Sequence, residues 1–381
     1  MPAEVLIAGA GPLGLALGLA LRQNGVACTL ADARAAGAAA DDRRVLALSH
    51  GSRQILERLG VWPRLAATPI TTIHVSQEGG LGRTLLRARD YGLSALGYVA
   101  DAGSLAAALE AQAAAQSLAI RRECKVVRAT AGTDHISACL SHGTGEETVR
   151  AALLAWAEGA VGEAADNVIS RDYGQSAVVA RVTVHPAPNG IAYERFTPAG
   201  PVALLPHQGS GCCAIIVRPH REARELLLLP ETAFLERLQW LLRGRLHFDT
   251  LGPRAAFPLA LRYRPRPVDK RSVWLGNAAQ TLHPVAGQGF NLALRDAWEL
   301  ARLLRDAPDP GDDALLRRHA HNRRFDRCGV IGFTDALVRI FGNHRPVVRH
   351  ARGAGLLLLD LSPPGRDFLA RRMMFGARAW V

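Results

Sequence analysis

The amino terminus leaves this chain little freedom in how it folds. An apolar run, Val5 to Ala8, leads into Gly9-Ala10-Gly11-Pro12-Leu13-Gly14, and a later apolar run ends at Asp32. The pattern predicts a buried parallel strand over 5–8, a helix over 13–23 and a second strand over 28–31. A strand, a glycine turn, a helix and a strand that ends in an acid form the fingerprint of a dinucleotide-binding unit.

Each residue type in this unit has a physical role. Gly9 permits the tight turn, Gly11 lets the backbone approach a pyrophosphate, and Gly14 lets the helix pack on the strand. The helix presents free N–H groups and the positive end of its dipole to the phosphates. The carboxylate of Asp32 suits a ribose hydroxyl and disfavours a 2′-phosphate, so FAD or NAD is favoured over NADP.

The segment 41–49 leads into a helix predicted over 51–59. An arginine in this segment can reach a pyrophosphate, although a charge cluster before a helix is also typical of a solvated cap. The segment by itself does not distinguish FAD from NAD.

A second glycine cluster follows a strand predicted over 272–275. Gly276-Asn277 ends this strand, and His283-Pro284 predicts an extended turn. A loop with Gly287, Gly289 and Asn291 then opens a helix predicted over 291–305. An ordinary strand–loop–helix connection explains this pattern. Two glycine-rich helix starts also suit a cofactor with two ends, the second helix pointing its N-terminus at an electron-rich ring such as a reduced isoalloxazine.

Size and composition limit the class of protein. The 381 residues, 49% of them hydrophobic, allow about two domains with a large core. No apolar stretch approaches the ~20 residues of a membrane span, and a core strand at the start leaves no room for a signal peptide. We therefore expect a cytoplasmic protein. The six cysteines form no C-x-x-C pair and no Cys/His cluster with zinc spacing, so no metal site is expected.

The net charge of +12 is carried almost entirely by arginine, because the chain has only two lysines. The arginines are scattered and no nucleic-acid motif is present, so no nucleic-acid partner is expected. Residues 301–381 contain fifteen Arg and eight Asp. This region predicts basic helices that pack back on the protein or make weak contact with an anionic membrane surface.

Several further motifs carry a resemblance that runs nearly end to end. The chain resembles the FAD-dependent aromatic hydroxylases of the p-hydroxybenzoate hydroxylase fold, in particular their ubiquinone-biosynthesis branch. The motifs are the first glycine stretch, Asp42-x-Arg44-x-x-Ala47-Leu48, Gly97-Tyr98-Val99, and the segments at 173–179, 192–197, 200–206 and 276–296. The last reads GNAAQTLHPVAGQGFNLALRD and is the most specific for this branch, which tolerates Asn277 and Gln280.

The resemblance implies an α/β fold, α+β overall, with a Rossmann-like FAD-binding domain and an inserted mixed β-sheet substrate domain. The FAD-binding domain would comprise 1–70, 97–172 and 262–340, and the substrate domain 71–96 and 173–261. A helical, basic segment would follow at 341–381. The resemblance also implies FAD, O2, and NAD(P)H or another electron donor.

The resemblance further implies positions for the site. The cofactor would contact Gly9, Gly11, Pro12, Gly14, Asp32, Arg44, Asn277, Pro284, Gly287, Gly289, Phe290 and Asn291. Strand-like alternation in 173–220 predicts a sheet over the flavin, lined by Tyr193, Arg195, Phe196, Pro206 and His207 unless these only pack across strands. His283 and Pro284 are the catalytic candidates, and His283 either hydrogen-bonds a phenol or fixes its loop.

One motif departs from the family pattern. After a strand at 153–156, the family has Asp-Gly followed by Ser and Arg, whereas this chain has Glu158-Gly159 and then Gly162, with no arginine. The motif is associated with flavin and nicotinamide contact. We therefore expect slow direct reduction by NAD(P)H.

The reaction implied is hydroxylation of a polyprenylphenol ring in ubiquinone biosynthesis, in which reduced flavin and O2 form an electrophilic C4a-hydroperoxide. A quinone-biosynthesis enzyme complex and the periphery of the inner membrane are the implied surroundings. The alternatives are another aromatic substrate or a flavin-binding scaffold subunit. A flavin-dependent halogenase is disfavoured because the chain has no W-x-W pattern and only two lysines.

Overall fold

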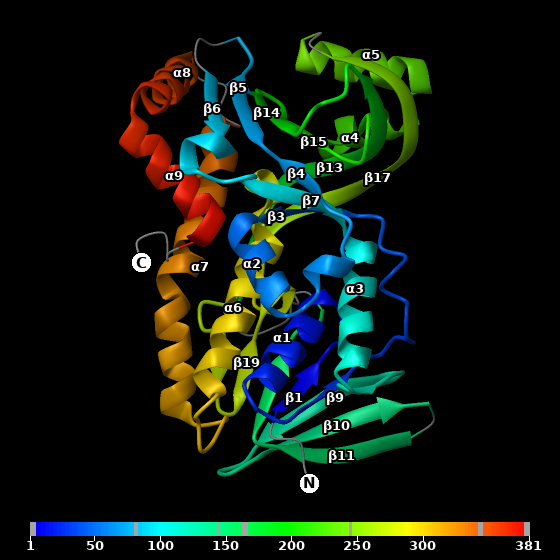
Figure 1. The fold of residues 1–381 in the computed structure, drawn as a ribbon, viewed down its shortest axis with the longest axis vertical. Coiled ribbons are helices and arrows are strands. Elements are labelled where there is room, and N and C mark those ends of the chain that lie inside the picture. The colour runs from blue at the N-terminus through cyan, green and yellow to red at the C-terminus, as the bar shows by residue number, and fades with distance from the viewer. Residues whose placement is uncertain are drawn as a thin grey trace.

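The computed structural model describes residues 5–79, 83–143, 145–159, 161, 167–243, 246–341 and 346–376. A six-stranded sheet forms the centre of its lower half in Figure 1, in the order β18-β19-β12-β1-β2-β8. These strands are β18 (Val268–Asp269), β19 (Ser272–Trp274), β12 (Leu153–Trp156), β1 (Val5–Ala8), β2 (Cys28–Ala31) and β8 (Ala119–Arg121). All pairs are parallel except β18–β19.

Four helices share one apolar core with this sheet. The helices are α1 (Pro12–Gln23), α2 (His50–Arg58), α3 (Ala102–Ala115) and α6 (Gln288–Leu304). Nine consecutive residues of α1, Leu13 to Leu21, are buried, because the helix lies between the sheet, α3 and α6. Gly14 permits the close packing of α1 on β1, since a Cβ there would lie 1.9 Å from the carbonyl oxygen of Gly9.

Two three-stranded sheets flank this centre. One comprises β9 (Cys124–Ala131), β10 (Ile136–His142) and β11 (Gly145–Ala151), and it closes the lower end in Figure 1. The other comprises β3 (Val45–Ser49), β7 (Gly97–Asp101) and β4 (Thr68–Ile70). It lies between the lower half and the upper half of the molecule.

An eight-stranded, strongly curved sheet forms the upper half (Figure 1). Its order is β20 (Gln280–Thr281), β17 (His247–Tyr263), β13 (Ile169–His185), β16 (Gly211–Pro219), β15 (Gly200–Pro206), β14 (Ile191–Thr197), β5 (Thr72–Gln77) and β6 (Arg83–Arg87). Helices α4 (His220–Leu228) and α5 (Glu231–Leu242) bury one face in an apolar core. The other face is turned toward the lower half.

The carboxy-terminal helices run along one side of both halves, as Figure 1 shows in orange and red. They are α7 (Asp313–Phe341), α8 (Pro346–Leu361) and α9 (Pro363–Phe375). No helix in the described part of the chain is long and apolar enough to cross a membrane.

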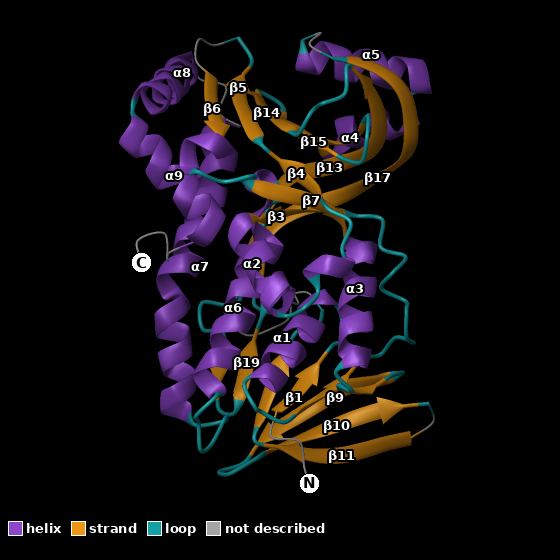
Figure 2. Cartoon of the chain, in the orientation of Figure 1, coloured by secondary structure: helices purple, strands orange, loops and turns teal. Residues whose placement is uncertain are grey.

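Figure 2 shows the mixture of helix and strand that confirms the predicted fold class. The structure corrects one boundary: α6 begins at Gln288, three residues before the predicted start. Gly287 has φ +59° and ends a short 3₁₀ helix, η4 (Val285–Gly287), directly before α6. The predicted loop from Gly287 to Asn291 is therefore mostly the first turn of the helix.

Candidate active site

In the described part of the chain, the start of α1 is a helix end without a side-chain cap. Gly11 caps the helix, and no side chain of the described residues bonds to its first N–H groups. A Cβ added at Gly11 would meet only the end of the Arg34 guanidinium, at 3.4 Å. The space over Gly11 is therefore closed by nothing more than a flexible side chain, and free N–H groups face it.

Asp32 lies beside this space with its side chain fully buried. Its carboxylate accepts hydrogen bonds from the backbone N–H of Ala10 at 2.7 Å and from the backbone and guanidinium of Arg34 at 2.8–3.0 Å. Burial opposes the charge, but the bonds from Arg34 and Ala10 prevail and lower the pKa of Asp32. Arg34 is not among the residues predicted from the sequence; the signal that points to it is a basic residue two positions after the acid that follows β2.

Two other loops reach the same place. Glu158 follows β12 and lies against Gly9, where an added Cβ would be 2.5 Å from that of Glu158. Burial, and then the charge of Asp32, raise the pKa of Glu158. Gly276 lies against Leu13 of α1. The exposed Asn277 beside it accepts a hydrogen bond from the N–H of Val161 through its backbone. Gly162, the other altered motif position, is outside the described residues.

Arg44 is held near the start of α3. Its guanidinium pairs with Asp42 at 2.6 Å and is more than half exposed. The backbone N–H of Ala102 bonds to the carbonyl of Arg44, and that of Gly103 bonds to the carbonyl of Asp42. Three hydrogen bonds hold the exposed guanidinium on Asp42, so Arg44 reaches a phosphate only when it leaves this pair.

The start of α6 is a second uncapped helix end in the part of the chain that the structure describes. The structure assigns no side-chain cap to this helix among the described residues. A Cβ added at Gly289 would meet nothing within 4 Å, and Pro284 before it is exposed. Phe290 instead packs against the main core. The N–H groups of the first turn and the open space at Gly289 thus suit an electron-rich ring.

Asn291 uses its whole amide inside the protein. Its oxygen accepts hydrogen bonds from the N–H of Ser49 at 2.8 Å and the hydroxyl of Ser52 at 2.7 Å. Its NH2 group donates to the carbonyls of Ala47 at 2.9 Å and Gly287 at 2.7 Å. The side chain therefore holds β3 against the start of α6 and has no remaining hydrogen bond for a ligand.

His283 is buried between the two halves. Its Nδ1 accepts the N–H of Val285 at 3.1 Å, and its ring meets Tyr173 edge to face at 5.5 Å. Burial lowers the pKa of His283 to about 4, so the ring is neutral and Nε2 carries the proton. Nε2 is buried and has no hydrogen-bond partner among the described residues. His283 thus fixes its loop through one nitrogen and leaves a donor free on the other.

The sheet face over this loop is mainly apolar. Phe196 of β14 packs with Val285, Val75, Leu337 and Val338. Tyr193 lies on the opposite face, in the α4–α5 core, and the alternation of side chains puts Arg195 on that face as well. Of the three sequence candidates on β14, only Phe196 therefore faces the loop with His283.

The last two substrate candidates lie at the far end of β15. Pro206 is buried at the end of this strand. Nε2 of His207 accepts a hydrogen bond from the guanidinium of Arg181 at 2.9 Å. Both side chains also contact the carboxylate of Asp101 at the start of α3. His207 thus joins the two halves of the molecule.

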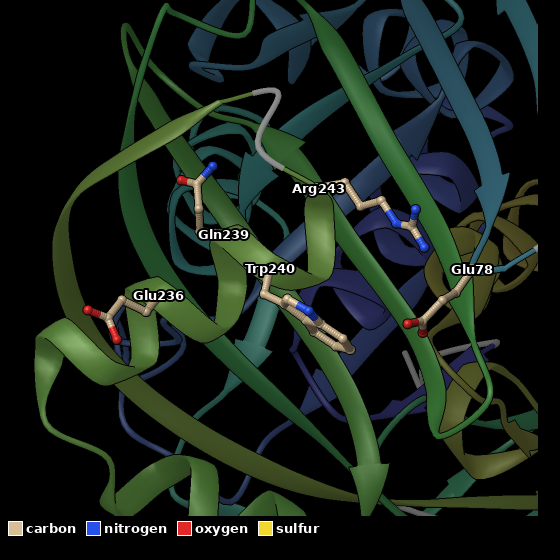
Figure 3. Close-up of a pocket in the computed structure, with 5 residues that line it drawn as sticks. All are labelled: Glu78, Glu236, Gln239, Trp240 and Arg243. Atoms are coloured by element: carbon tan, nitrogen blue, oxygen red, sulfur yellow. The ribbon is translucent and has the colours of Figure 1, made fainter.

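Two hollows have different characters. An apolar cavity of about 90 Å³ adjoins Gln288 and Asn291 at the start of α6. Side chains of β3, β4, β5, β6 and α9 form most of its lining, which includes Leu48, Ile70, Ile73, Leu86, Met373 and Met374. Figure 3 shows the other, of about 530 Å³, where Glu78 lies across from Glu236, Gln239, Trp240 and Arg243 of the α5 region. It lies on the α5 side of the sheet, away from both helix starts.

Comparison with known proteins agrees with this geometry. The family model for the FAD binding domain matches residues 2–327. The chain is 33% identical to ubiquinone hydroxylase UbiL of Rhodospirillum rubrum, covering 98% of this chain and 89% of that protein. It is 29% identical to 3-demethoxyubiquinol 3-hydroxylase of Escherichia coli, covering 94% and 95%. The fold of p-nitrophenol 4-monooxygenase PnpA from Pseudomonas putida DLL-E4 matches with a TM-score of 0.78 and 15% identity over 99% of each chain.

Proposed function

Because this chain belongs to the family of FAD-dependent monooxygenases that act as hydroxylases in ubiquinone biosynthesis, we propose that it hydroxylates the aromatic ring of a polyprenylphenol. The observation that carries the proposal is the apolar sheet face around Phe196 and Val285, set over the neutral donor of His283. Among such phenols, the sequence motifs favour the 2-octaprenyl-6-methoxyphenol type.

The residues present fit FAD. The uncapped start of α1 with Gly9, Gly11, Pro12 and Gly14 suits the pyrophosphate, and Asp32 suits a ribose hydroxyl. Arg44 and Asn277 are proposed to contact the pyrophosphate and the ribityl chain. The start of α6, with Pro284, Gly287 and Gly289, suits the edge of the isoalloxazine. Asn291 supports this edge only indirectly, because its side chain holds β3.

Bound FAD would supply the electrons and the activation of O2, because this chemistry belongs to the cofactor and not to amino-acid side chains. The protein positions the phenol and excludes water from it with the apolar side chains of β5, β14 and α7. The free N–H groups in the first turn of α6 would stabilise negative charge on the adjacent edge of the isoalloxazine. Nε2–H of His283 would donate a hydrogen bond to an oxygen of the substrate.

The apolar cavity between β3 and α9 supports a substrate with a prenyl tail. It adjoins Gln288 and Asn291 at the start of α6 and is lined mostly by aliphatic and methionine side chains. Such a lining offers an isoprenoid chain burial at about 25 cal/mol per Å² of apolar surface. A small polar phenol would gain nothing from this cavity.

A single-turnover experiment tests the proposed function without assuming an electron donor. The FAD-loaded protein is reduced chemically, freed of reductant, and mixed with O2 and a 2-prenylphenol. We expect one hydroxylated product per flavin, identified by mass spectrometry. Deletion of the gene in its own host should cause the corresponding non-hydroxylated quinone precursor to accumulate. Oxidation of the flavin without product, together with an unchanged quinone pool in the deletion strain, would overturn the proposal.

A further inference from the structure

A carboxyl group that the sequence analysis did not single out lies in the middle of the sheet face turned toward His283. Glu194 is on β14, opposite Ala203 of β15 and opposite Val75 of β5. Its neighbours on the same face, Ala192 and Phe196, both pack toward the FAD-binding half. Because side chains alternate along a strand, Glu194 points toward that half as well.

The pairing of strands shows what lies beneath Glu194. Val75, directly beside it, contacts the cluster of Val285. On the other side of Glu194, the next residues across the sheet are Ala203 of β15 and Ile215 of β16. Ile215 packs in one apolar cluster with Tyr173. The ring of Tyr173 contacts that of His283. Since Val285 and His283 belong to one short loop, Glu194 lies over the loop that precedes α6.

The same row is only partly buried. Glu194, Ala203, Ile215 and Val179 form one line across four central strands, and all of them keep some accessible surface. The residues on the opposite face of these strands are buried under α4 and α5. Central strands that are open on one face only indicate a space between the sheet and the FAD-binding half, with Glu194 as a carboxyl group in its wall.

Nothing in the described residues satisfies this carboxyl group. No hydrogen bond or ion pair joins Glu194 to another described residue, and burial raises its pKa to about 7. An unpaired carboxyl group in an apolar wall is costly, and it persists where a ligand or a reaction uses it.

The titratable groups around Glu194 are engaged elsewhere or neutral. His74 of β5 contacts Tyr193 on the opposite face, and Asp335 of α7 is paired with Arg171 and Arg339. β15 contributes no titratable side chain.

Two further groups belong to other elements around the space. Arg181 of β13 is paired with Asp101. His283 of the loop is neutral, and its Nε2–H is a donor rather than an acceptor. Glu194 is thus the proton acceptor among these groups.

We propose that Glu194 is a catalytic residue that accepts the proton of the substrate's phenol group during hydroxylation. The inference rests on the proposed function and adds the group that activates the ring. The O–H bond of the phenol breaks, an O–H bond forms on the carboxylate, and the electron pair stays on the phenol oxygen. The resulting phenolate donates electron density to the ring carbons that are attacked. The proton returns to solvent or product after the reaction.

The test uses the FAD-loaded full chain and two substrates, a short-chain 2-prenylphenol and its O-methyl ether. The ether has no proton for Glu194 to accept. We expect Glu194→Gln to lower the single-turnover rate with the phenol roughly 100-fold, while the rate with the ether stays as slow as in the wild type. In the wild type, the rate with the phenol should rise as the pH increases through the neutral range. This rise should be absent in the variant.

Glu236→Gln, the same change on the surface of α5, is the matched control and should keep the wild-type rate and pH profile. FAD content and the rate of chemical reduction report whether Glu194→Gln is intact. If that variant does not fold, the pH dependence of the wild-type single-turnover rate tests the role of Glu194. The rate with the phenol should depend on pH, whereas the rate with the ether should not. A wild-type rate for Glu194→Gln, or equal profiles for the two substrates, overturns the role of Glu194 alone. A wild type that hydroxylates no prenylphenol overturns the proposed function and this role with it.

Discussion

The amide oxygen of Asn291 accepts a hydrogen bond from the backbone N–H of Ser49 at 2.8 Å, across 242 residues of chain. Three more bonds from the same amide reach Ser52, Ala47 and Gly287. One side chain therefore sets the position of β3 relative to the start of α6. The two elements that would enclose the flavin ring are fixed together by a side-chain amide whose four hydrogen bonds are all made within the protein.

Replacement of Asn291 by alanine should destabilise the protein by about 3 kcal/mol, because buried N–H and C=O groups lose their partners. The measurement is the free energy of unfolding in urea, together with the affinity for FAD. Asn322→Ala, on an exposed position of α7, is the control and should change neither. An Asn291→Ala variant with wild-type stability would contradict the structural role.

Gly11→Leu should yield protein that folds but is free of FAD. The space over Gly11 is open apart from the end of the Arg34 side chain, so a leucine side chain can fit there and would occupy the proposed site of the pyrophosphate. The flavin content after purification and the far-ultraviolet circular dichroism are measured together. Full FAD occupancy in a folded Gly11→Leu protein would show that the start of α1 does not bind the pyrophosphate.

Reduction of the flavin by NADH or NADPH should be slow. Glu158 stands where the resemblance places an aspartate, and burial, followed by the charge of Asp32, raises its pKa and disfavours its negative charge. Stopped-flow bleaching of the flavin absorbance, with and without a prenylphenol, gives the rate. Glu158→Asp is the informative variant and should accelerate reduction. Rapid reduction of the wild type at micromolar nicotinamide would show that the altered motif has no kinetic effect.

The stability of the fold should decrease as the pH falls from 6.5 toward 4. Burial lowers the pKa of His319 and of His283 from 6.5 to about 4. In this window the unfolded chain binds protons that the folded chain does not, so each histidine lowers stability by up to about 3 kcal/mol at the acidic end. The contribution is fully present above pH 6.5. Urea unfolding of the wild type and of His319→Gln across this pH range measures the contribution of His319 to the free energy of unfolding. If the stability of the two proteins depends on pH in the same way, His319 does not contribute to this dependence.

The protein should bind anionic lipid vesicles more strongly than neutral vesicles through its carboxy-terminal helices, and this binding should weaken in high salt. Leu358, Leu361 and Phe368 of α8 and α9 are 50–70% exposed. Each nearby arginine adds about 1 kcal/mol at an anionic surface, which salt screens within about 8–10 Å.

Co-sedimentation with liposomes measures this binding. Truncation after Phe341 should abolish it, provided that the shortened protein keeps FAD. The double change Leu358→Ser and Leu361→Ser should weaken it, whereas Leu228→Ser, at an exposed leucine of α4, should not. Equal binding to both vesicle types would assign the contact to the leucines alone, and no binding to either would indicate delivery of the substrate by a partner protein.

The sequence by itself determined the dinucleotide-binding unit, because each of its features depends on neighbouring residues. The strands at 5–8 and 28–31 and the helix between them lie where the apolar runs and glycines predict. The positive φ of Gly9 and the contact at Gly14 follow from the same local pattern. The fold class followed from motifs spread along the whole chain.

Only the tertiary structure decided which side chains share the site. The motif Ala192-Tyr193-Glu194-Arg195-Phe196 alternates between two covered faces, and hydrophobicity does not tell which face meets the other half of the molecule. The packing of Phe196 on Val285 shows that the side chains of Phe196 and Glu194 face the other half of the molecule. Tyr193, which was predicted to line the site, faces the α4–α5 core instead. Asn291 likewise looks like a cofactor ligand in the sequence, and its partners on β3 and α2 are 239–244 residues away. Contacts between residues so distant in the chain arise from packing, and no local pattern encodes them.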